Sequence, residues 1–267
     1  MSASPPVERT FWLGTSWKMT KSIAEAAKYA DELAAAVDDI PNHVELFVLP
    51  PFTMISLVAQ RLAHTRVRVG AQNAHWASSG AYTGEVSTSM VAEAGATIVE
   101  IGHSERRAAF GETDTTVNLK TKAVLSAGLR PLVCVGEPWE EREFGTASEY
   151  VVRQVKVALA GIPAHDISRV MVAYEPVWAI GDGGRPATAS QVREMHSIIR
   201  AALVDRYGEA GEAVPLLYGG SVNQDNAAEL ASQEHVDGLF VGRAAWTADG
   251  YLSLARLVAT TVQGVSA

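Results

Sequence analysis

Eight short apolar runs rich in β-forming residues recur along the chain, and longer segments with helical periodicity separate them. This alternation constrains the fold most, because strands that alternate with helices form a parallel sheet. Runs that are apolar on both faces are typical of a sheet that helices cover on both sides. We expect strands at residues 11–16, 44–49, 67–71, 98–101, 131–135, 170–174, 215–218 and 238–241.

Three of the intervening segments show helical features clearly. Val192, Ile199 and Leu203 recur on one face, and Asn223 can cap the free N–H groups that open a helix. We expect helices at residues 190–205, 223–231 and 251–262.

No linker rich in proline, serine or charge divides the chain. We therefore predict one domain over residues 1–267, a (β/α)₈ TIM barrel of the α/β class, with an open doubly wound sheet as the alternative. Residues 1–9 are expected to form a flexible N-terminal extension.

The composition supports a large core and narrows the classes of function. The chain has 267 residues and 48% hydrophobic content, and a single barrel takes about 250 residues. Its one cysteine, Cys134, excludes an intramolecular disulfide framework and a cysteine-rich metal site. A net charge of −8 disfavours nucleic acid, although a local pocket can still bind a small anion. With no secretory signal and no apolar run of about 20 residues, we expect a cytoplasmic protein that does not bind membranes.

Polar residues lie just after several of the expected strands, where the active site of a barrel lies. Lys18 follows the first strand, His103 the fourth and Glu175 the sixth, while the stretches "YGGSVN" and "VGRAAW" follow the last two. Apart from Glu175, each feature alone is more often a surface charge, a structural histidine or a turn. Together, one at each strand end, they predict a single pocket.

These side chains suit proton transfer next to a carbonyl. A carboxylate can take a carbon-bound proton, an imidazole can polarise the carbonyl, and an ammonium can stabilise the enediolate. Backbone N–H groups in the two glycine-containing loops can bind phosphate. The segment "VWAIGDGGRP" after Glu175 is a stiff run that ends in glycines, which predicts a hinged lid that excludes water.

The stretches "WKM", "GAQN", "GAYTGEVS", "GHSERR", "CVGE", "AYEPVWAIG", "YGGSV" and "DGLFVG" together resemble the triosephosphate isomerase family over nearly the whole chain. The resemblance implies the family's known roles: Glu175 as catalytic base, His103 as electrophile and Lys18 as electrostatic lysine, with Glu105 beside it. It implies a phosphorylated sugar as substrate, no cofactor and no metal.

The resemblance also implies where the substrate and a partner subunit bind. The lid corresponds to residues 177–184, and the family is typically a homodimer. Thr83 would then lie next to the active site of the other chain. Substrate binding is assigned to Ser16, Lys18, Gly181, Ser221, Gly242 and Arg243.

Several positions depart from the usual family pattern. Ser16 and Thr20 replace asparagines, and Arg243 replaces a glycine of the last phosphate loop. Pro138 and Trp139 replace a threonine and a leucine. The lid, usually Gly-Thr-Gly-Lys-Thr, is longer by one residue and reads Gly181-Asp182-Gly183-Gly184-Arg185-Pro186.

Ser16 is the departure nearest to the chemistry. Serine is smaller than asparagine and lacks its NH₂ donor, which leaves space for a larger substrate. The stretches "GTSWKM" and "GLFVGRAAW" and the altered lid resemble the erythrulose-phosphate isomerase branch of the family. That branch converts L-erythrulose 1-phosphate to D-erythrulose 4-phosphate in erythritol breakdown.

Other interpretations are compatible with parts of the sequence. The triose reaction of glycolysis and gluconeogenesis is the main alternative. A phosphate-binding barrel without catalysis is disfavoured by the intact Lys18, His103 and Glu175, since a binding protein needs no base. A barrel enzyme with another cofactor is disfavoured because no Schiff-base or metal-ligand pattern is present.

Overall fold

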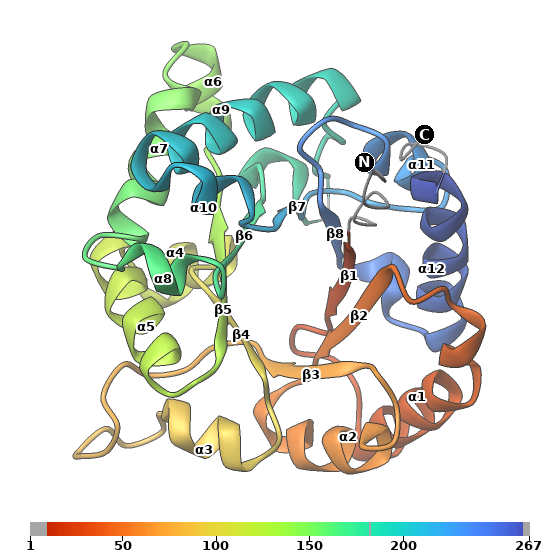
Figure 1. Ribbon diagram of the computed structural model, residues 1–267. Coiled ribbons are helices and arrows are strands. Elements are labelled where there is room, and N and C mark those ends of the chain that lie inside the picture. Colours follow the sequence, from red (N-terminus) through yellow and green to blue (C-terminus); the bar gives the residue numbers. More distant parts are fainter. Residues whose placement is uncertain (1–9, 182, 264–267) are drawn as a thin grey trace, which may run out of the picture.

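The computed structural model describes residues 10–181 and 183–263, so the predicted extension at 1–9 and the lid residue Asp182 lie outside the described residues. Its eight parallel strands pair in chain order, and β8 pairs with β1 to close a barrel. Figure 1 shows the strands around the centre and the helices outside them. The strands are β1 (Phe11–Ser16), β2 (Val44–Leu49), β3 (Arg68–Ala71), β4 (Ile98–Ile101), β5 (Arg130–Val135), β6 (Met171–Tyr174), β7 (Leu216–Tyr218) and β8 (Gly238–Val241).

Helices follow each strand and surround the barrel. The α-helices are α1 (Ile23–Ala36), α2 (Ile55–Leu62), α3 (Thr88–Glu93), α4 (Ser104–Phe110), α5 (Asp114–Ser126), α6 (Trp139–Glu143), α7 (Ala147–Ala158), α8 (Ala164–Ile167), α9 (Ala189–Tyr207), α10 (Glu209–Glu212), α11 (Ala227–Ala231) and α12 (Ala248–Gln263). Short 3₁₀ helices are η1 (Val37–Asp39), η2 (Phe52–Met54), η3 (Val177–Ala179) and η4 (Arg243–Ala245). Among the described residues, none of the helices has the length and apolar character needed to cross a membrane.

The structure confirms the predicted (β/α)₈ barrel and corrects several boundaries. The expected strands at 67–71, 170–174 and 215–218 each begin one residue later, and the expected strand at 131–135 begins one residue earlier. Helix α11 begins only at Ala227, so the helix expected from Asn223 is shorter than predicted. The Asn223 side chain instead accepts the N–H groups of Asp225 and Asn226, at 2.9 and 3.2 Å, in a turn before the helix.

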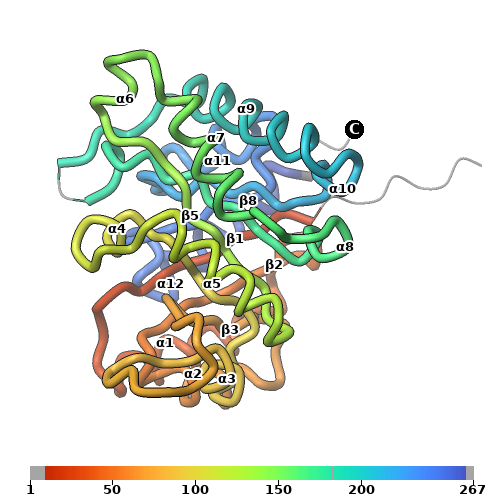
Figure 2. Tube along the Cα trace, turned by 90° about the vertical axis from the view of Figure 1, so that its left-hand side faces the viewer, coloured from red at the N-terminus to blue at the C-terminus, as the bar shows by residue number. Residues whose placement is uncertain are grey.

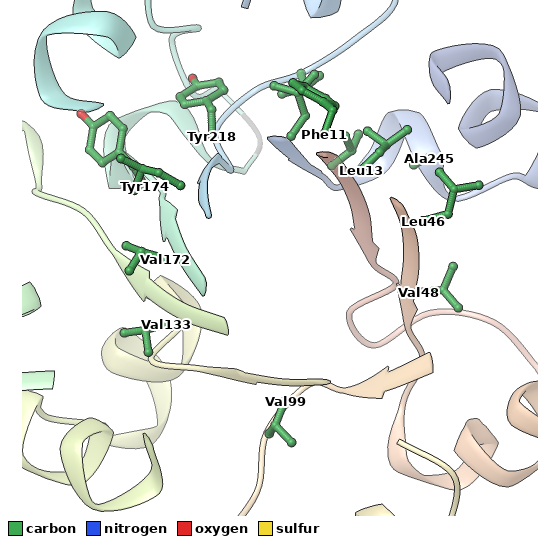
Figure 3. Packing of buried hydrophobic residues seen from close by; sticks show 14 of the residues in the cluster. Phe11, Leu13, Leu46, Val48, Val99, Val133, Val172, Tyr174, Tyr218 and Ala245 are labelled. Carbon is green, nitrogen blue, oxygen red and sulfur yellow. The ribbon is translucent and has the colours of Figure 1, made fainter. Parts of the chain in front are cut away.

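Successive side chains of each strand point to opposite faces and build two separate cores. Figure 3 shows Val99, Val133 and Val172 pointing away from the ring of strands, toward the helices. The intervening residues, such as Leu132 and Cys134 on β5, form the second core inside the barrel.

Aromatic rings fill part of the barrel interior. Phe47 stacks on Phe240 with ring centroids 5.8 Å apart and meets Trp12 edge-on at 6.3 Å. A Cβ at Gly14 would lie 1.9 Å from Cζ of Phe47, so glycine at this strand position leaves the space that the ring occupies. The filled interior directs any ligand to the open carboxyl end of the strands.

Candidate active site

Loops that follow the strands gather on one side of the barrel. In Figure 2, α4 and α6, which follow β4 and β5, lie toward one side, and α8 and α10, which precede β6 and β7, lie toward the other. A cavity of about 510 Å³ opens among the loops after the strands. It is lined by nine predicted site residues: Ser16, Lys18, His103, Glu105, Glu175, Gly181, Ser221, Gly242 and Arg243.

Glu175 lies at the base of this cavity, and its side chain is 2% exposed. Its N–H donates to the carbonyl of Val135 at 2.7 Å, which fixes the residue at the end of β6. A Cβ at Gly219 would lie 2.7 Å from Cγ of Glu175, so this glycine makes room for the carboxylate. Burial raises the pKa of Glu175, and the nearby His103 and Lys18 oppose that rise.

His103 is oriented by the helix that it precedes. It is the N-cap of α4, and its Nδ1 accepts the backbone N–H of Glu105 at 3.2 Å. A neutral imidazole with Nδ1 as acceptor carries its proton on Nε2. Nε2 lies 3.7 Å from Oε2 of Glu175, so the ring presents an N–H donor beside the carboxylate.

Lys18 is held in an uncommon backbone conformation. Its φ is +53°, in the left-handed region that non-glycine residues rarely adopt. The Gln72 amide donates to the carbonyls of Lys18 and Leu49, at 3.0 and 2.9 Å, and ties this loop to β2. The Lys18 ammonium donates to Oε1 of Glu105 at 2.6 Å, the neighbour that the resemblance predicts. Lys18 thus places a positive charge at the cavity wall.

Glu100 is a buried acid of the site that the sequence analysis did not identify. It lies on β4 inside the barrel, 2% exposed, and accepts a hydrogen bond of 3.0 Å from the Ser16 hydroxyl. Its other oxygen, Oε1, lies 4.0 Å from Nε2 of His103. Burial raises the pKa of Glu100 to about 7. The signal in the sequence is a charged residue within a strand that is otherwise apolar on both faces, "IVEI".

Cys134 lies beside the two buried carboxyl groups. One ligand atom each of Glu100, Cys134 and Glu175 fall within 4.8 Å of one another. Burial raises the pKa of the Cys134 thiol well above its ordinary range, so the thiol keeps its proton and can donate to Glu175. The predicted absence of a metal stays a prediction.

The expected lid begins at η3 and is anchored by a buried acid. Oε1 of Glu137 accepts hydrogen bonds from Trp178 Nε1 at 2.9 Å, Tyr174 Oη at 3.1 Å and Arg142 Nε at 2.8 Å. Beyond this anchor, Ile180 and Gly181 line the cavity. The fixed start and the glycine-containing end agree with a hinged segment; lid motion stays a prediction.

Two glycine-containing loops near the C-terminal end of the chain form another part of the cavity wall. Gly219, Gly220 and Ser221 follow β7, and Gly242 and Arg243 follow β8; all of them line the cavity. Arg243 begins the short helix η4. The N–H groups at the start of a helix and a guanidinium both favour an anion. The wall therefore suits a phosphate group.

Thr83 does not line the cavity of its own chain. It lies in the loop between β3 and α3, which projects outward from the barrel in Figure 1. Within this loop, the His75 ring packs on Trp76 and Tyr82, with centroids 4.1 and 4.3 Å apart. The loop is thus internally packed, and its predicted contact with a partner stays a prediction.

A closed parallel barrel with a carboxylate, an imidazole and an ammonium at its carboxyl end defines the class of α/β-barrel enzymes that can move a proton next to a carbonyl. The family model described as triosephosphate isomerase matches residues 11–258. The chain belongs to the triosephosphate isomerase family, as its motifs predicted.

Curated relatives and a solved structure agree with this family. An L-erythrulose-1-phosphate isomerase of Rhizobium meliloti (strain 1021) is 50% identical, and the match covers 94% of this chain and 98% of the relative. A protein of the same name from Mycolicibacterium smegmatis is 47% identical, over 93% of each chain. The crystal structure of triosephosphate isomerase from Bartonella henselae superposes with a TM-score of 0.84 at 35% identity, covering 92% of this chain and 98% of that one.

Proposed function

We propose that this protein converts L-erythrulose 1-phosphate to D-erythrulose 4-phosphate through an enediol(ate) intermediate. The observation that carries the proposal is the convergence of Lys18, His103 and Glu175 on one cavity beside the short side chain of Ser16. The names of the curated relatives at 46–50% identity support the four-carbon substrate.

The residues perform the proton transfer in named roles. Glu175 removes the proton from the third carbon, counted from the phosphate end, and the electrons form a double bond to the second carbon. The Nε2–H of His103 polarises the carbonyl oxygen and passes protons between the two oxygens, while the Lys18 ammonium stabilises the negative charge. Glu175 then returns the proton to the second carbon, and the carbonyl forms at the third carbon.

The phosphate is held by the loops that follow β6, β7 and β8. Gly181, Ser221 and Gly242 supply backbone N–H groups, and the Arg243 guanidinium adds a positive charge within a chain of net charge −8. Glu105 supports Lys18 through their 2.6 Å contact. Closure of the lid over the phosphate would exclude water from the intermediate.

The triose reaction is the second candidate, because the similar solved structure from Bartonella henselae is a triosephosphate isomerase. A side-by-side assay of purified protein on L-erythrulose 1-phosphate and on dihydroxyacetone phosphate separates the two. We expect a higher kcat/KM for the four-carbon substrate. Faster turnover of the triose phosphate would overturn the substrate assignment but keep the proton-transfer chemistry. Turnover of neither would favour a phosphate-binding barrel without catalysis.

We further propose that the chain acts in the cytoplasm as a single-domain homodimer, with Thr83 next to the active site of the partner subunit. Exposed apolar side chains support an interface around this region: Met19 is 98% exposed, Phe110 70% and Tyr82 47%. Light scattering during size-exclusion chromatography tests the assembly. We expect twice the mass of one chain, and a single-chain mass at micromolar concentration would overturn the dimer.

A further inference from the structure

A second cavity joins the active site on the side away from the phosphate loops. It measures about 230 Å³ and shares Ser16, Lys18, His103 and Glu105 with the larger cavity. Glu100 lines it together with Gln72 and Asn73. Ser16 therefore stands at the boundary between the two cavities, and Glu100 belongs to the second.

Ser16 is fixed at this boundary by two hydrogen bonds. Its hydroxyl donates to Oε2 of Glu100 at 3.0 Å, and its carbonyl accepts the indole N–H of Trp246 at 3.1 Å. The hydroxyl is thus turned toward the strand β4.

The second oxygen of Glu100 is left without a partner. Oε1 is buried and has no hydrogen-bond partner among the described residues. Gln72 and Asn73 are engaged elsewhere, since Gln72 donates to Lys18 and Asn73 accepts from Lys120 at 2.8 Å. A buried polar atom without a partner is costly, and such atoms in native proteins usually have a partner.

We propose that Glu100 is a specificity-determining residue whose Oε1 binds the terminal hydroxymethyl group of a four-carbon ketose phosphate. This inference rests on the proposed function. Counted from the phosphate, the reacting carbons are the second and third, so the fourth carbon and its hydroxyl extend past Ser16 toward the buried Glu100, away from the exposed Met19 and Phe110 that line the second cavity at the proposed dimer interface. There the substrate hydroxyl supplies the partner that Oε1 lacks. A three-carbon substrate ends at the reacting carbon and leaves Oε1 unpaired.

Two simpler roles for Glu100 make different predictions. If Glu100 only tied down Ser16, its loss would affect every substrate alike. If it acted through the His103 ring 4.0 Å away, its loss would slow proton transfer for every substrate. Only direct binding makes the effect of Glu100 depend on the terminal hydroxyl of the substrate. A thermodynamic cycle over protein and substrate isolates that dependence.

The cycle compares L-erythrulose 1-phosphate with its 4-deoxy analogue, which keeps four carbons but lacks the terminal hydroxyl. The wild-type protein is expected to prefer the hydroxylated substrate in kcat/KM by about 10- to 100-fold. Glu100→Leu, which has similar volume and no polar atoms, should reduce that preference to within about threefold of unity. The matched control Ser16→Ala removes the bond to Oε2 but keeps Oε1, and should retain the preference. Competitive inhibition by inorganic phosphate reports whether each variant keeps an intact phosphate site.

The outcomes separate the two proposals. A wild-type protein that does not turn over L-erythrulose 1-phosphate refutes the proposed function. If the wild type turns over both compounds equally well, Glu100 does not bind the hydroxyl, and this result needs no variant. A preference that survives Glu100→Leu in a protein with normal phosphate inhibition also overturns the inference.

Discussion

The guanidinium of Arg185 lies over the ring of Trp139, 4.5 Å from its centroid. Both residues depart from the usual family pattern, one in the lid and one after β5. Trp139 also meets Trp178 edge-on at 5.5 Å, next to the Glu137 anchor. The two departures therefore contact each other. Through Trp139 they connect Arg185, at the far end of the lid, with Trp178 near its start.

This contact predicts how the lid responds to substitution. A cation–π contact contributes about 0.5 to 2 kcal/mol, so Trp139→Ala should increase lid opening by roughly 2- to 30-fold. Hydrogen exchange measured with inorganic phosphate should quicken at residues 177–186 and stay unchanged in α12. Leu119→Ala, which removes an exposed apolar side chain on α5, is the control. Equal exchange in Trp139→Ala and wild type would show that the contact does not hold the lid.

Replacing the proposed base should separate catalysis from binding. Glu175→Gln keeps the shape of the side chain but cannot accept the substrate proton, so kcat should fall by about 10² to 10⁴-fold. The inhibition constant for inorganic phosphate should stay within about twofold, because the phosphate loops are unchanged. Glu194→Gln, on the exposed side of α9, serves as control. More than about half of wild-type kcat in Glu175→Gln would rule out the base assignment.

Restoring the usual family residue at the cavity boundary should change substrate preference. Asparagine at position 16 is larger than serine and would extend toward Glu100, to which the Ser16 hydroxyl donates. Ser16→Asn should lower kcat/KM for L-erythrulose 1-phosphate about 10- to 200-fold relative to dihydroxyacetone phosphate. Parallel kinetics on both substrates measure this ratio. An equal loss on both would indicate that Ser16 serves packing, and specificity would then lie elsewhere, first in residues 182–186.

The buried Glu100 carboxyl predicts a pH dependence of stability. In the unfolded chain this carboxyl has a pKa of about 4.3, whereas burial in the folded protein raises its pKa to about 7. Between these values the folded state binds the extra proton, so the free energy of unfolding falls as pH rises through this window. A glutamine cannot titrate, so Glu100→Gln should lack this decrease in the free energy of unfolding, which is on the order of 3 kcal/mol in the wild type. Urea unfolding at pH 5 and pH 8 measures the difference, with Glu194→Gln as control; parallel losses in wild type and Glu100→Gln would contradict it.

The sequence predicts the fold well because the strand pattern is local. Strands β1, β2, β4 and β8 match their expected bounds. The N-terminus of α11 was wrong because Asn223 uses its side chain for a turn, and a capping residue has the same chemistry in both settings.

The proposed catalytic residues were accessible to sequence reasoning because they follow strand ends, while Glu100 lies within a strand. Its partner Ser16 is 84 positions away, and no local pattern joins them. The same holds for Gln72, which fixes Lys18 through a backbone carbonyl 54 positions away. Contacts of this kind depend on the register of strands around the closed barrel, which periodicity alone does not give.

The left-handed backbone of Lys18 sets folding stability against the proposed catalytic role of this residue. A glycine there would adopt φ +53° without steric cost, which for other residues is about 1 to 2 kcal/mol. Selection for thermal stability alone would therefore favour removing the lysine, and with it the positive charge at the cavity wall. A stabilisation screen blind to activity should recover glycine at position 18, and positions where such a screen opposes the natural residue would outline the active site without any assay.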